Sequence, residues 1–166
     1  MITVNTTLPA EARKLREDVF IHEQGFENEF DAIDESAHHV IYWENDRAVG
    51  TCRFFPAEED GAYYIGRMAV AKDHRHQQLG TVILEAAEAA IKKLGGKKTM
   101  LSAQVRAQNF YLRNGYTGDP KEVHMDEGEP HRWLYKKYSM QEFISMRNSQ
   151  AYCCIFIECM MFLVYN

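Results

Sequence analysis

The sequence predicts one α/β domain, built on a mixed, mostly antiparallel sheet with helices on both faces. Three segments carry apolar residues at helical spacing, whereas the segments between them have the two-residue period of strands. Their order along the chain is helix, strands, helix, strand, helix, strands, which is typical of a mixed sheet covered by helices. With 166 residues, 46% of them hydrophobic, the chain is long enough to bury a sizeable core.

The N-terminal half is expected to contain one helix followed by three strands. Residues 8–24 have helical apolar spacing, with Thr7 as the N-cap and Gly25 at the end. An acidic, irregular segment covers residues 26–37. Gly66 lies within the third strand and indicates a bulge or the close approach of another group. The strands are expected at residues 38–43, 47–55 and 63–70.

The C-terminal half is expected to contain two helices and three strands. Residues 80–94 form the clearest helix, because one apolar stripe runs along it and Gly95-Gly96 follows. The remaining elements are expected as a strand at 99–104, a short helix at 107–114 ended by Gly115, and strands at 116–124 and 131–138 around a loop at 126–130.

Two segments of different character divide the chain into a domain at 1–140 and a tail at 141–166. Residues 151–165 are nearly all apolar, and fifteen residues are short for a membrane span, which takes about 20. We expect this tail to pack on the domain or on a second copy in a homodimer, since so large an apolar patch is rarely left exposed. An extension that is not native to the protein is the alternative.

Charge and cysteine content exclude several classes of function. The net charge of −5 and the pI near 5.8 argue against non-specific nucleic-acid binding, which needs a basic surface. The four cysteines have no metal-ligand spacing, so we expect reduced thiols and no metal site. The first residues show neither a basic start nor an apolar run, so we expect no signal peptide, no membrane partner and a cytoplasmic protein.

One segment is suited to binding phosphate. A strand ending at Val70 leads through a basic turn containing Arg75 to a helix that begins near Gly80 and Thr81. The first N–H groups of a helix have no internal partners, and the helix dipole adds positive potential there. Phosphate or pyrophosphate fits such a site. A solvated turn, with glycine present only for backbone freedom, is the other interpretation that these residues allow.

Tyr111 lies on the short helix after a central strand and is a candidate acid. Its phenol, with a reference pKa near 10, stays protonated and can donate a proton to a leaving thiolate. A packed tyrosine without a chemical role is the alternative.

Together these segments resemble the GNAT superfamily of acyl-CoA-dependent N-acyltransferases. The pyrophosphate motif of that family, Gln/Arg-x-x-Gly-x-Gly/Ala, is matched from Arg75 to Gly80, with Gln78 at the first glycine position. The later family pattern is matched at Ala107, Phe110, Tyr111, Gly115 and Tyr116. The likeness extends over about residues 5–138 to the ElaA/YjcF-like subgroup, through Val19–Gln24, Asp34, His38, Val49–Arg53, Gly66–Val70, Ser102–Gln104 and Gly128–His131.

The resemblance implies a twisted sheet whose central strand pair splays apart to hold acyl-CoA. The pair is the strand ending at Val70 and the strand 99–104. It implies that backbone groups of Met68, Ala69 and Val70 meet the pantetheine or the thioester carbonyl. The other implied cofactor contacts are Arg75, Gln78, Gly80, Thr81 and Asn109.

The reaction implied is direct transfer of an acetyl group from acetyl-CoA to a primary amine. Tyr111 is the implied acid, and Glu23 is the first candidate for the base, with His38 and His131 behind it. Glu23 as an exposed carboxylate and the histidines as structural residues remain alternatives. A small-molecule or peptide amine is the expected acceptor. A non-catalytic acyl-CoA-binding or regulatory module with the same fold is the alternative function.

Four further residues have expected structural roles. Arg53 and Arg67 are expected to be anchors paired with acids. Asp31 and Asp34 are expected in a solvated acidic loop, with substrate-cation binding as the alternative.

Overall fold

The computed structural model describes residues 1–126, 128–139 and 141–142. The chain divides into two compact units, Met1–Lys136 and Lys137–Asn166. The apolar segment 151–165 lies outside the described residues, so its role in packing or dimerisation stays a prediction. None of the helices in the described part of the chain is long and apolar enough to span a membrane.

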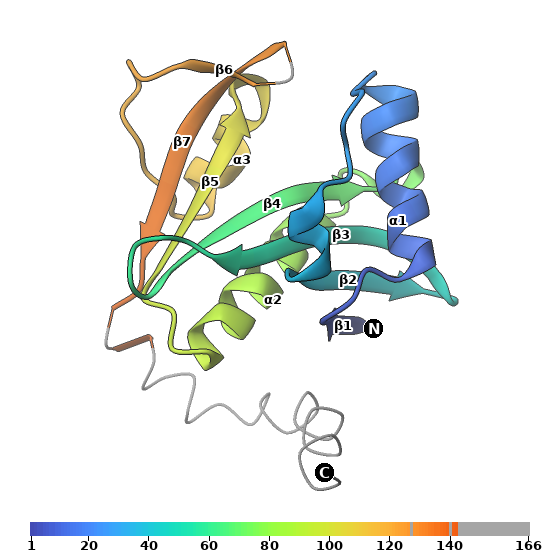
Figure 1. Cartoon of the computed structure of the whole chain (residues 1–166), viewed down its shortest axis with the longest axis horizontal. Helices are drawn as coiled ribbons and strands as arrows, with labels where there is room; N and C mark the ends of the chain where they lie inside the picture. Colours follow the sequence, from blue (N-terminus) through green and yellow to red (C-terminus); the bar gives the residue numbers. More distant parts are fainter. Residues whose placement is uncertain (127, 140, 143–166) are drawn as a thin grey trace, which may run out of the picture. The chain divides into compact units, whose positions relative to one another are not determined.

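The first unit is built on a seven-stranded sheet with the order β1-β2-β3-β4-β5-β7-β6 (Figure 1). Strands β1 to β4 pair antiparallel in sequence order, β5 is parallel to β4, and β6 pairs antiparallel with β7. The predicted mixed and mostly antiparallel sheet is therefore confirmed. The strands are β1 (Ile2–Asn5), β2 (His38–Glu44), β3 (Arg47–Pro56), β4 (Ala62–Val70), β5 (Lys98–Gln104), β6 (His124–Asp126) and β7 (Glu129–Lys137).

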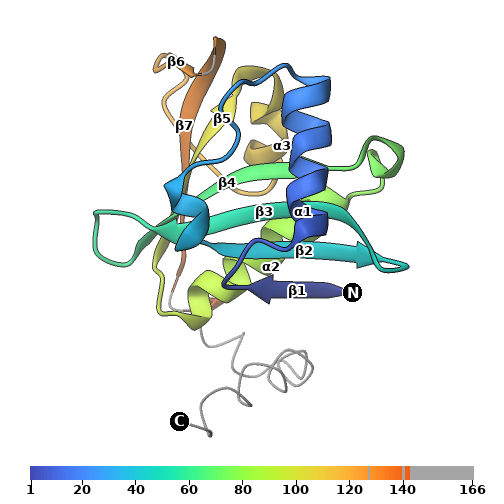
Figure 2. The same cartoon turned by 45° about the vertical axis from the view of Figure 1, so that its right-hand side comes forward.

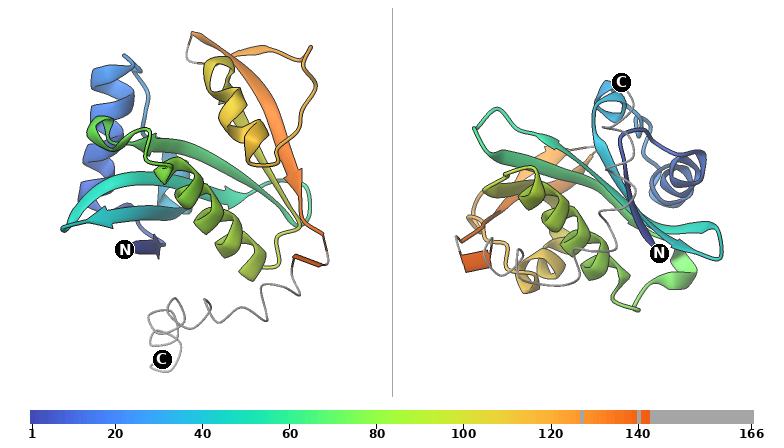
Figure 3. Two further views of the ribbon diagram at one scale, coloured as in Figure 1. Left: turned by 180° about the vertical axis from the view of Figure 1, so that it is seen from behind. Right: turned by 90° about the horizontal axis from the view of Figure 1, so that it is seen from below.

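Helices cover both faces of the sheet, as predicted. α1 and the segment after it lie in front of β2 to β4 in Figures 1 and 2, and α2 lies behind these strands, as Figure 3 shows from the back. α3 covers β5 and β7 from behind. The helical elements are α1 (Ala10–Arg16), η1 (Glu17–Glu23), η2 (Ala32–Glu35), η3 (Lys72–His74), α2 (Leu79–Lys93), η4 (Val105–Ala107) and α3 (Gln108–Arg113).

The core consists of two apolar layers, one on each side of the sheet. Leu15, Val19 and Phe20 pack on Val49 and Ala69 on the α1 side. On the other side α2 approaches the sheet so closely at Gly50 that a Cβ there would lie 2.3 Å from the Ile83 side chain. A larger residue at position 50 would therefore push α2 away from β3.

The central strand pair β4/β5 splays apart, which confirms the predicted opening. The register pairs Ala62 with Lys98, Tyr63 with Thr99, and Tyr64 with Met100. Beyond Tyr64 the two strands diverge into a V that is visible between β4 and β5 in Figure 1. The opening runs along the second half of β4.

The predicted bulge in β4 is also confirmed. Opposite β4, the register shifts between Thr51 and Arg53. The residue with positive φ is Arg67, at 52°, rather than Gly66. The bulge turns the last part of β4 away from β5.

The first predicted helix differs from the structure in its start and its type. α1 begins after Pro9 rather than Thr7, and from Glu17 the helix widens into a π-helix. Its predicted end at Gly25 is confirmed, since Gly25 has φ 77° and donates from its N–H to the Ile21 carbonyl at 3.0 Å. π-helical turns are rare in proteins, and those that do occur are often found at functional sites.

The strand predicted at 116–124 is wrong for most of its length. Only Thr117 pairs, as an isolated bridge to Tyr135, and β6 begins at His124. Asp119 explains the difference, because its side chain accepts from the Lys121 N–H at 2.8 Å and its carbonyl accepts from the Glu122 N–H at 3.2 Å. Such a local turn competes with strand pairing.

Candidate active site

The open edge of β4 presents backbone groups to the gap. The Ala71 N–H donates to the Val49 carbonyl of β3 at 2.9 Å. Because neighbouring residues of a strand point their polar groups to opposite sides, the N–H and C=O of Val70 face away from β3, toward the gap. The Val70 carbonyl already accepts from Arg75 Nε at 3.1 Å. The polar groups of Ala69 face β3 by the same alternation, and its side chain is buried in the α1 core. The Met68 carbonyl lies in one peptide plane with the Ala69 N–H and points the opposite way, toward the gap.

A groove of about 600 Å³ lies beside this edge, at the N-terminus of α2. It brings together five of the predicted cofactor residues, Val70, Arg75, Gln78, Gly80 and Thr81. The other lining residues are His74, His76, Leu79, Phe110, Arg113 and Asn114.

The N-terminus of α2 has the features of an anion site. No side chain caps this 15-residue helix, and its first turn contains no acidic residue. The first intrahelical bonds run from the N–H groups of Thr81 and Val82 to the Gln78 carbonyl, at 3.0 and 3.3 Å. The N–H groups of Leu79 and Gly80 come before the first intrahelical bonds. N–H groups at this position of a helix normally donate to an acceptor outside the helix. The residues present therefore fit a pyrophosphate.

The backbone conformation of Gln78 shows why the family motif has a glycine at this position. It is left-handed, with φ 62° and ψ 9°, a conformation that costs a residue with a side chain about 1 kcal/mol. The loop thus keeps its shape despite the departure from the family motif. Gly80 has a different reason, because a Cβ there would lie 3.2 Å from the Phe110 ring. Its absence lets α2 and α3 pack together.

Arg75 and Glu23, predicted for different roles, are paired with each other. The guanidinium donates from Nη1 and Nη2 to both carboxylate oxygens, at 2.6 and 2.8 Å. These hydrogen bonds lower the pKa of Glu23, although the slight burial of the carboxyl opposes them. Glu23 is thus ionised but engaged, and a carboxylate with a lowered pKa is a weak base.

A second polar bridge joins the end of the π-helix to the end of β5. Gln24 Oε1 accepts from Gln104 Nε2 at 3.1 Å and from Arg106 Nη2 at 2.9 Å. Arg106 Nε also donates to Gln104 Oε1 at 2.8 Å. The residues at the open end of the β4/β5 gap are therefore tied to the segment that carries Glu23.

Tyr111 has the protonation state that an acid needs. Burial raises the pKa of its phenol, and the neighbouring Cys52 thiol contributes in the same direction. Its ring lies 4.9 Å from that of Phe110 and 5.9 Å from that of Tyr116. Tyr116 in turn shares a 3.0 Å hydrogen bond with Thr99 of β5. The packing fixes Tyr111 between α3 and the sheet.

The candidate histidines lie in three different environments. His38 stacks on Phe54 at 4.8 Å, and burial lowers the pKa of its imidazole. His39 points to the opposite face, where its Nε2 lies 3.0 Å from the Asp34 carbonyl oxygen, as the strand period predicted. His131 Nδ1 lies 2.9 Å from the Glu129 carbonyl oxygen.

Arg53 and Arg67 are paired with acids, as predicted. Arg53 contacts Asp31 at 2.6 Å, and Arg67 contacts Glu29 at 2.9 Å. The prediction of a solvated acidic loop is wrong for Asp34, which is 8% exposed. It is buried because Arg16 binds both of its oxygens, at 2.6 and 3.0 Å.

The predictions from sequence missed part of the groove and included residues outside its lining. Three of the eight predicted cofactor residues are not among the lining residues, namely Met68, Ala69 and Asn109, and neither are the predicted catalytic residues Tyr111, Glu23 and His38. Phe110, Arg113 and Asn114 line the groove, and their i, i+3, i+4 spacing on a helix that follows the Ala107 motif was the available signal. Asn109, predicted as a cofactor contact, is exposed on α3 and is not among the lining residues.

Comparison with known proteins agrees with this geometry. A sequence profile of the acetyltransferase (GNAT) family matches residues 7–116. The chain belongs to this family. As a GNAT protein it is an acyltransferase, and it is 30% identical to the N-acetyltransferase YjcF of Bacillus subtilis over 138 residues, which cover 82% of this chain and 97% of YjcF.

Two solved structures have the same fold. An acyl-CoA N-acyltransferase from Pseudomonas aeruginosa is 26% identical, with a TM-score of 0.71, over 82% of this chain and 99% of its own. Escherichia coli ElaA is 25% identical, with a TM-score of 0.71, over 82% of this chain and all of its own. The predicted ElaA/YjcF-like subgroup is therefore confirmed.

Proposed function

We propose that this GNAT protein transfers an acetyl group from acetyl-CoA directly to a primary amine. The observation that carries the proposal is the open edge of β4, with the uncapped N-terminus of α2 at one end. The protonated Tyr111 is one ring away from the groove, because its ring lies 4.9 Å from that of the lining residue Phe110. A thioester cosubstrate with a pyrophosphate needs all three features. The aminoglycoside 6'-N-acetyltransferase solved with coenzyme A shares the fold, with a TM-score of 0.67 at 15% identity.

In the proposed complex, each part of the donor meets one element of the chain. The N–H groups of Leu79 and Gly80 hold the pyrophosphate, with Arg75, Gln78 and the Thr81 side chain beside them. Val70 and Met68 offer backbone groups to the pantetheine along the gap. The Met68 N–H, next to the left-handed Arg67, polarises the thioester carbonyl as an oxyanion donor in this proposal, because the alternation turns the Ala69 N–H toward β3. Asn109 remains a proposed contact at the rim.

The proposed chemistry balances with two protein groups. The amine lone pair forms a bond to the carbonyl carbon, and the carbon–sulfur bond breaks. Tyr111 gives its proton to the departing sulfur, and a base takes the proton that the amine nitrogen loses. Burial raises the pKa of Tyr111, so the phenol is protonated before transfer, although the same shift makes it a weaker acid.

For the base we keep Glu23 as the first proposal, with one added condition. Its carboxylate is held by Arg75, so it becomes available only when the guanidinium turns to another anion. Binding of the pyrophosphate supplies such an anion. His38, with its lowered pKa, and His131 are the remaining proposals.

Tyr111→Phe tests the acid. We expect kcat with acetyl-CoA and an accepted amine to fall by about a hundredfold or more, since a general acid contributes that much. Release of the CoA thiol measures the rate, and calorimetry checks that the affinity for acetyl-CoA is unchanged. Tyr135→Phe, on an exposed strand position, is the control. Full activity of Tyr111→Phe with every accepted amine contradicts the assignment. A protein that binds acetyl-CoA but acetylates no amine is instead a binding module.

A further inference from the structure

A continuous row of aromatic rings crosses the sheet on its open face. Phe55 of β3 lies 5.5 Å from Tyr64 of β4, Tyr64 lies 5.9 Å from Trp133 of β7, and Trp133 lies 5.2 Å from His124 of β6. We call these four residues the aromatic row. Its members come from four strands, and none of them is fully buried. The row is therefore a surface.

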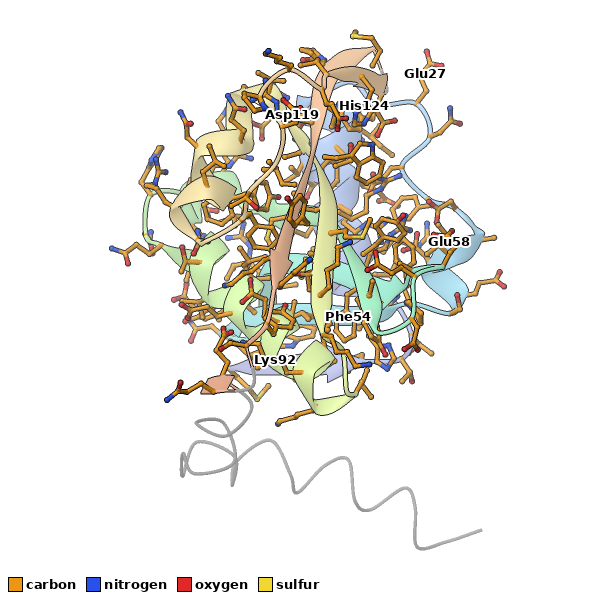
Figure 4. All side chains as sticks on the ribbon, turned by 90° about the vertical axis from the view of Figure 1, so that its left-hand side faces the viewer. Glu27, Phe54, Glu58, Lys92, Asp119 and His124 are labelled. Atoms are coloured by element: carbon orange, nitrogen blue, oxygen red, sulfur yellow. The ribbon has the colours of Figure 1, made fainter. Side chains whose placement is uncertain are left out.

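The aromatic row lies on the face of the sheet opposite α2 and α3. On β7, Arg132 contacts Gln108 of α3 and Lys136 contacts Glu88 of α2, so the residue between them in the alternation, Trp133, points the other way. In Figure 4, the labelled His124 lies on the side of β5 and β7 away from α3. No helix of the described residues covers this part of the sheet in Figure 1.

The aromatic row adjoins the gap in which the donor thioester is proposed to lie. Tyr64 is the last residue of β4 that pairs with β5, so the row crosses the sheet where the opening begins. Tyr111 and the helix N-terminus serve the gap from the opposite face. An acceptor that approaches from the face with the row meets the acyl group without displacing the donor.

Two side-chain pairs beside the aromatic row are bonded within the protein. Ser102 Oγ lies 2.9 Å from His124 Nε2, and the Tyr64 hydroxyl donates to Glu58 at 3.4 Å. An amino sugar would need many free donors and acceptors here. The ring faces remain as the means of recognition. A ring face binds another ring by stacking, and it binds an ammonium group through its π-electrons. Arg53 already lies 5.7 Å from the Phe55 ring centre.

We propose that the aromatic row is the acceptor platform and that the acceptor is a primary amine carrying an aromatic ring. This inference rests on the proposed acetyl transfer. The ring of the acceptor stacks on Trp133 and Tyr64, and its amine reaches into the gap. Trp133 is a specificity-determining residue, since it is 43% exposed and lies at the centre of the row.

The test compares arylalkylamines, such as phenethylamine and tryptamine, with propylamine and glucosamine at saturating acetyl-CoA. We expect kcat/KM to be at least about tenfold higher for the aryl amines. Trp133→Ala should raise their KM by about tenfold and leave kcat and acetyl-CoA affinity unchanged, and Trp133→Phe should restore most of the loss. Tyr135→Ala is the matched control, because Tyr135 lies on the same strand and face and is 42% exposed.

Three outcomes would overturn the inference. Equal use of propylamine or glucosamine would show that the rings do not select the acceptor. An unchanged KM in Trp133→Ala would remove the row from the site. A loss of mass in light scattering on Trp133→Ala, with KM unaffected, would make the row a subunit interface. Absence of acetyl-CoA binding would instead refute the proposed function itself, so the two failures are distinguishable.

Discussion

Two clusters of arginine and carboxylate lie along the same helical segment, and they differ in burial. Where α1 passes into the π-helix, Arg16 lies with Glu29 and Asp34, and these residues are 1%, 1% and 8% exposed. At the end of the π-helix, the side chains of Arg75 and Glu23 are 32% and 34% exposed. Both clusters contain bidentate pairs with distances of 2.6 to 3.0 Å, so their geometry is alike.

The difference in burial assigns the two clusters different tasks. A buried charge that loses its partner cannot recover water, so the inner cluster holds α1 and η2 in one arrangement. An exposed pair is worth little to stability, because water and salt replace it readily. The Arg75–Glu23 pair can therefore be exchanged for a pair with a ligand anion. The same chemistry is a fixed anchor in one place and an exchangeable contact in the other.

The largest expected effect comes from breaking the inner cluster. Arg16→Met leaves Glu29 and Asp34 without their main partner, so we expect a loss of about 3–5 kcal/mol in the free energy of unfolding. Urea denaturation measures it. Arg13→Met is the matched control on the same helix, since Arg13 also lies over Phe30 and has only a 3.8 Å contact with Glu17. Its loss should stay within about 1 kcal/mol. Equal losses would refute the distinction.

A smaller effect is expected from acid. Burial alone would raise the pKa of Asp34, but hydrogen bonds from Arg16 and Arg53 lower it to about 2, below the reference value of 3.8. Asp34 thus stabilises the fold at any pH above its reference pKa of 3.8. This contribution to the free energy of unfolding is lost as the pH falls through the pKa of the folded state. We expect a loss of about 1 kcal/mol by pH 3 and about 2.5 kcal/mol when protonation is complete.

Glu29 acts in the opposite direction and reduces the net acid effect. Burial raises its pKa, with Arg16 opposing, so the folded state takes up this proton more readily than the unfolded state. Urea titrations between pH 7 and pH 3 measure the sum of the two. Asp34→Asn should flatten the acid limb. A limb that is unchanged in Asp34→Asn would show that other carboxyls cause the loss.

The fold could be predicted because its signals are local or repeat along the chain. The period of two placed β2 to β5, and the apolar stripe placed α2 within one residue at each end. The π-helix could not be predicted, because its wide turn keeps the apolar positions of an ordinary helix. The strand at 116–124 failed because a side-chain turn at Asp119 outweighed its propensity.

The candidate site was predictable where one segment contains all of its parts. The turn from Arg75 to Thr81 is such a segment, and it lines the groove. The pairing of Arg75 with Glu23 joins residues 52 apart, and no pattern in one sequence indicates it. The aromatic row is hidden for the same reason, since its rings come from four strands.

The smallest expected effect on stability comes from the outer pair, where affinity is the sensitive quantity. Glu23→Gln keeps the shape of the side chain and removes its charge, so folding stability should change by about 1 kcal/mol or less. The guanidinium of Arg75 then no longer forms an ion pair with a carboxylate. We expect the affinity for CoA, measured by calorimetry, to rise by about three- to tenfold.

The control for this prediction is Glu17→Gln, which removes an exposed carboxylate from the same π-helix at its other end. Its effect on CoA affinity should be small, because the charge it removes is not bonded to Arg75. A weaker affinity in Glu23→Gln would mean that Glu23 positions Arg75 for the ligand. If Glu23 is also the base, kcat falls while affinity rises. A lower kcat together with a higher CoA affinity would show that the carboxylate of the exchangeable pair is also catalytic. A higher affinity with an unchanged kcat would show that Glu23 only competes with the ligand for Arg75.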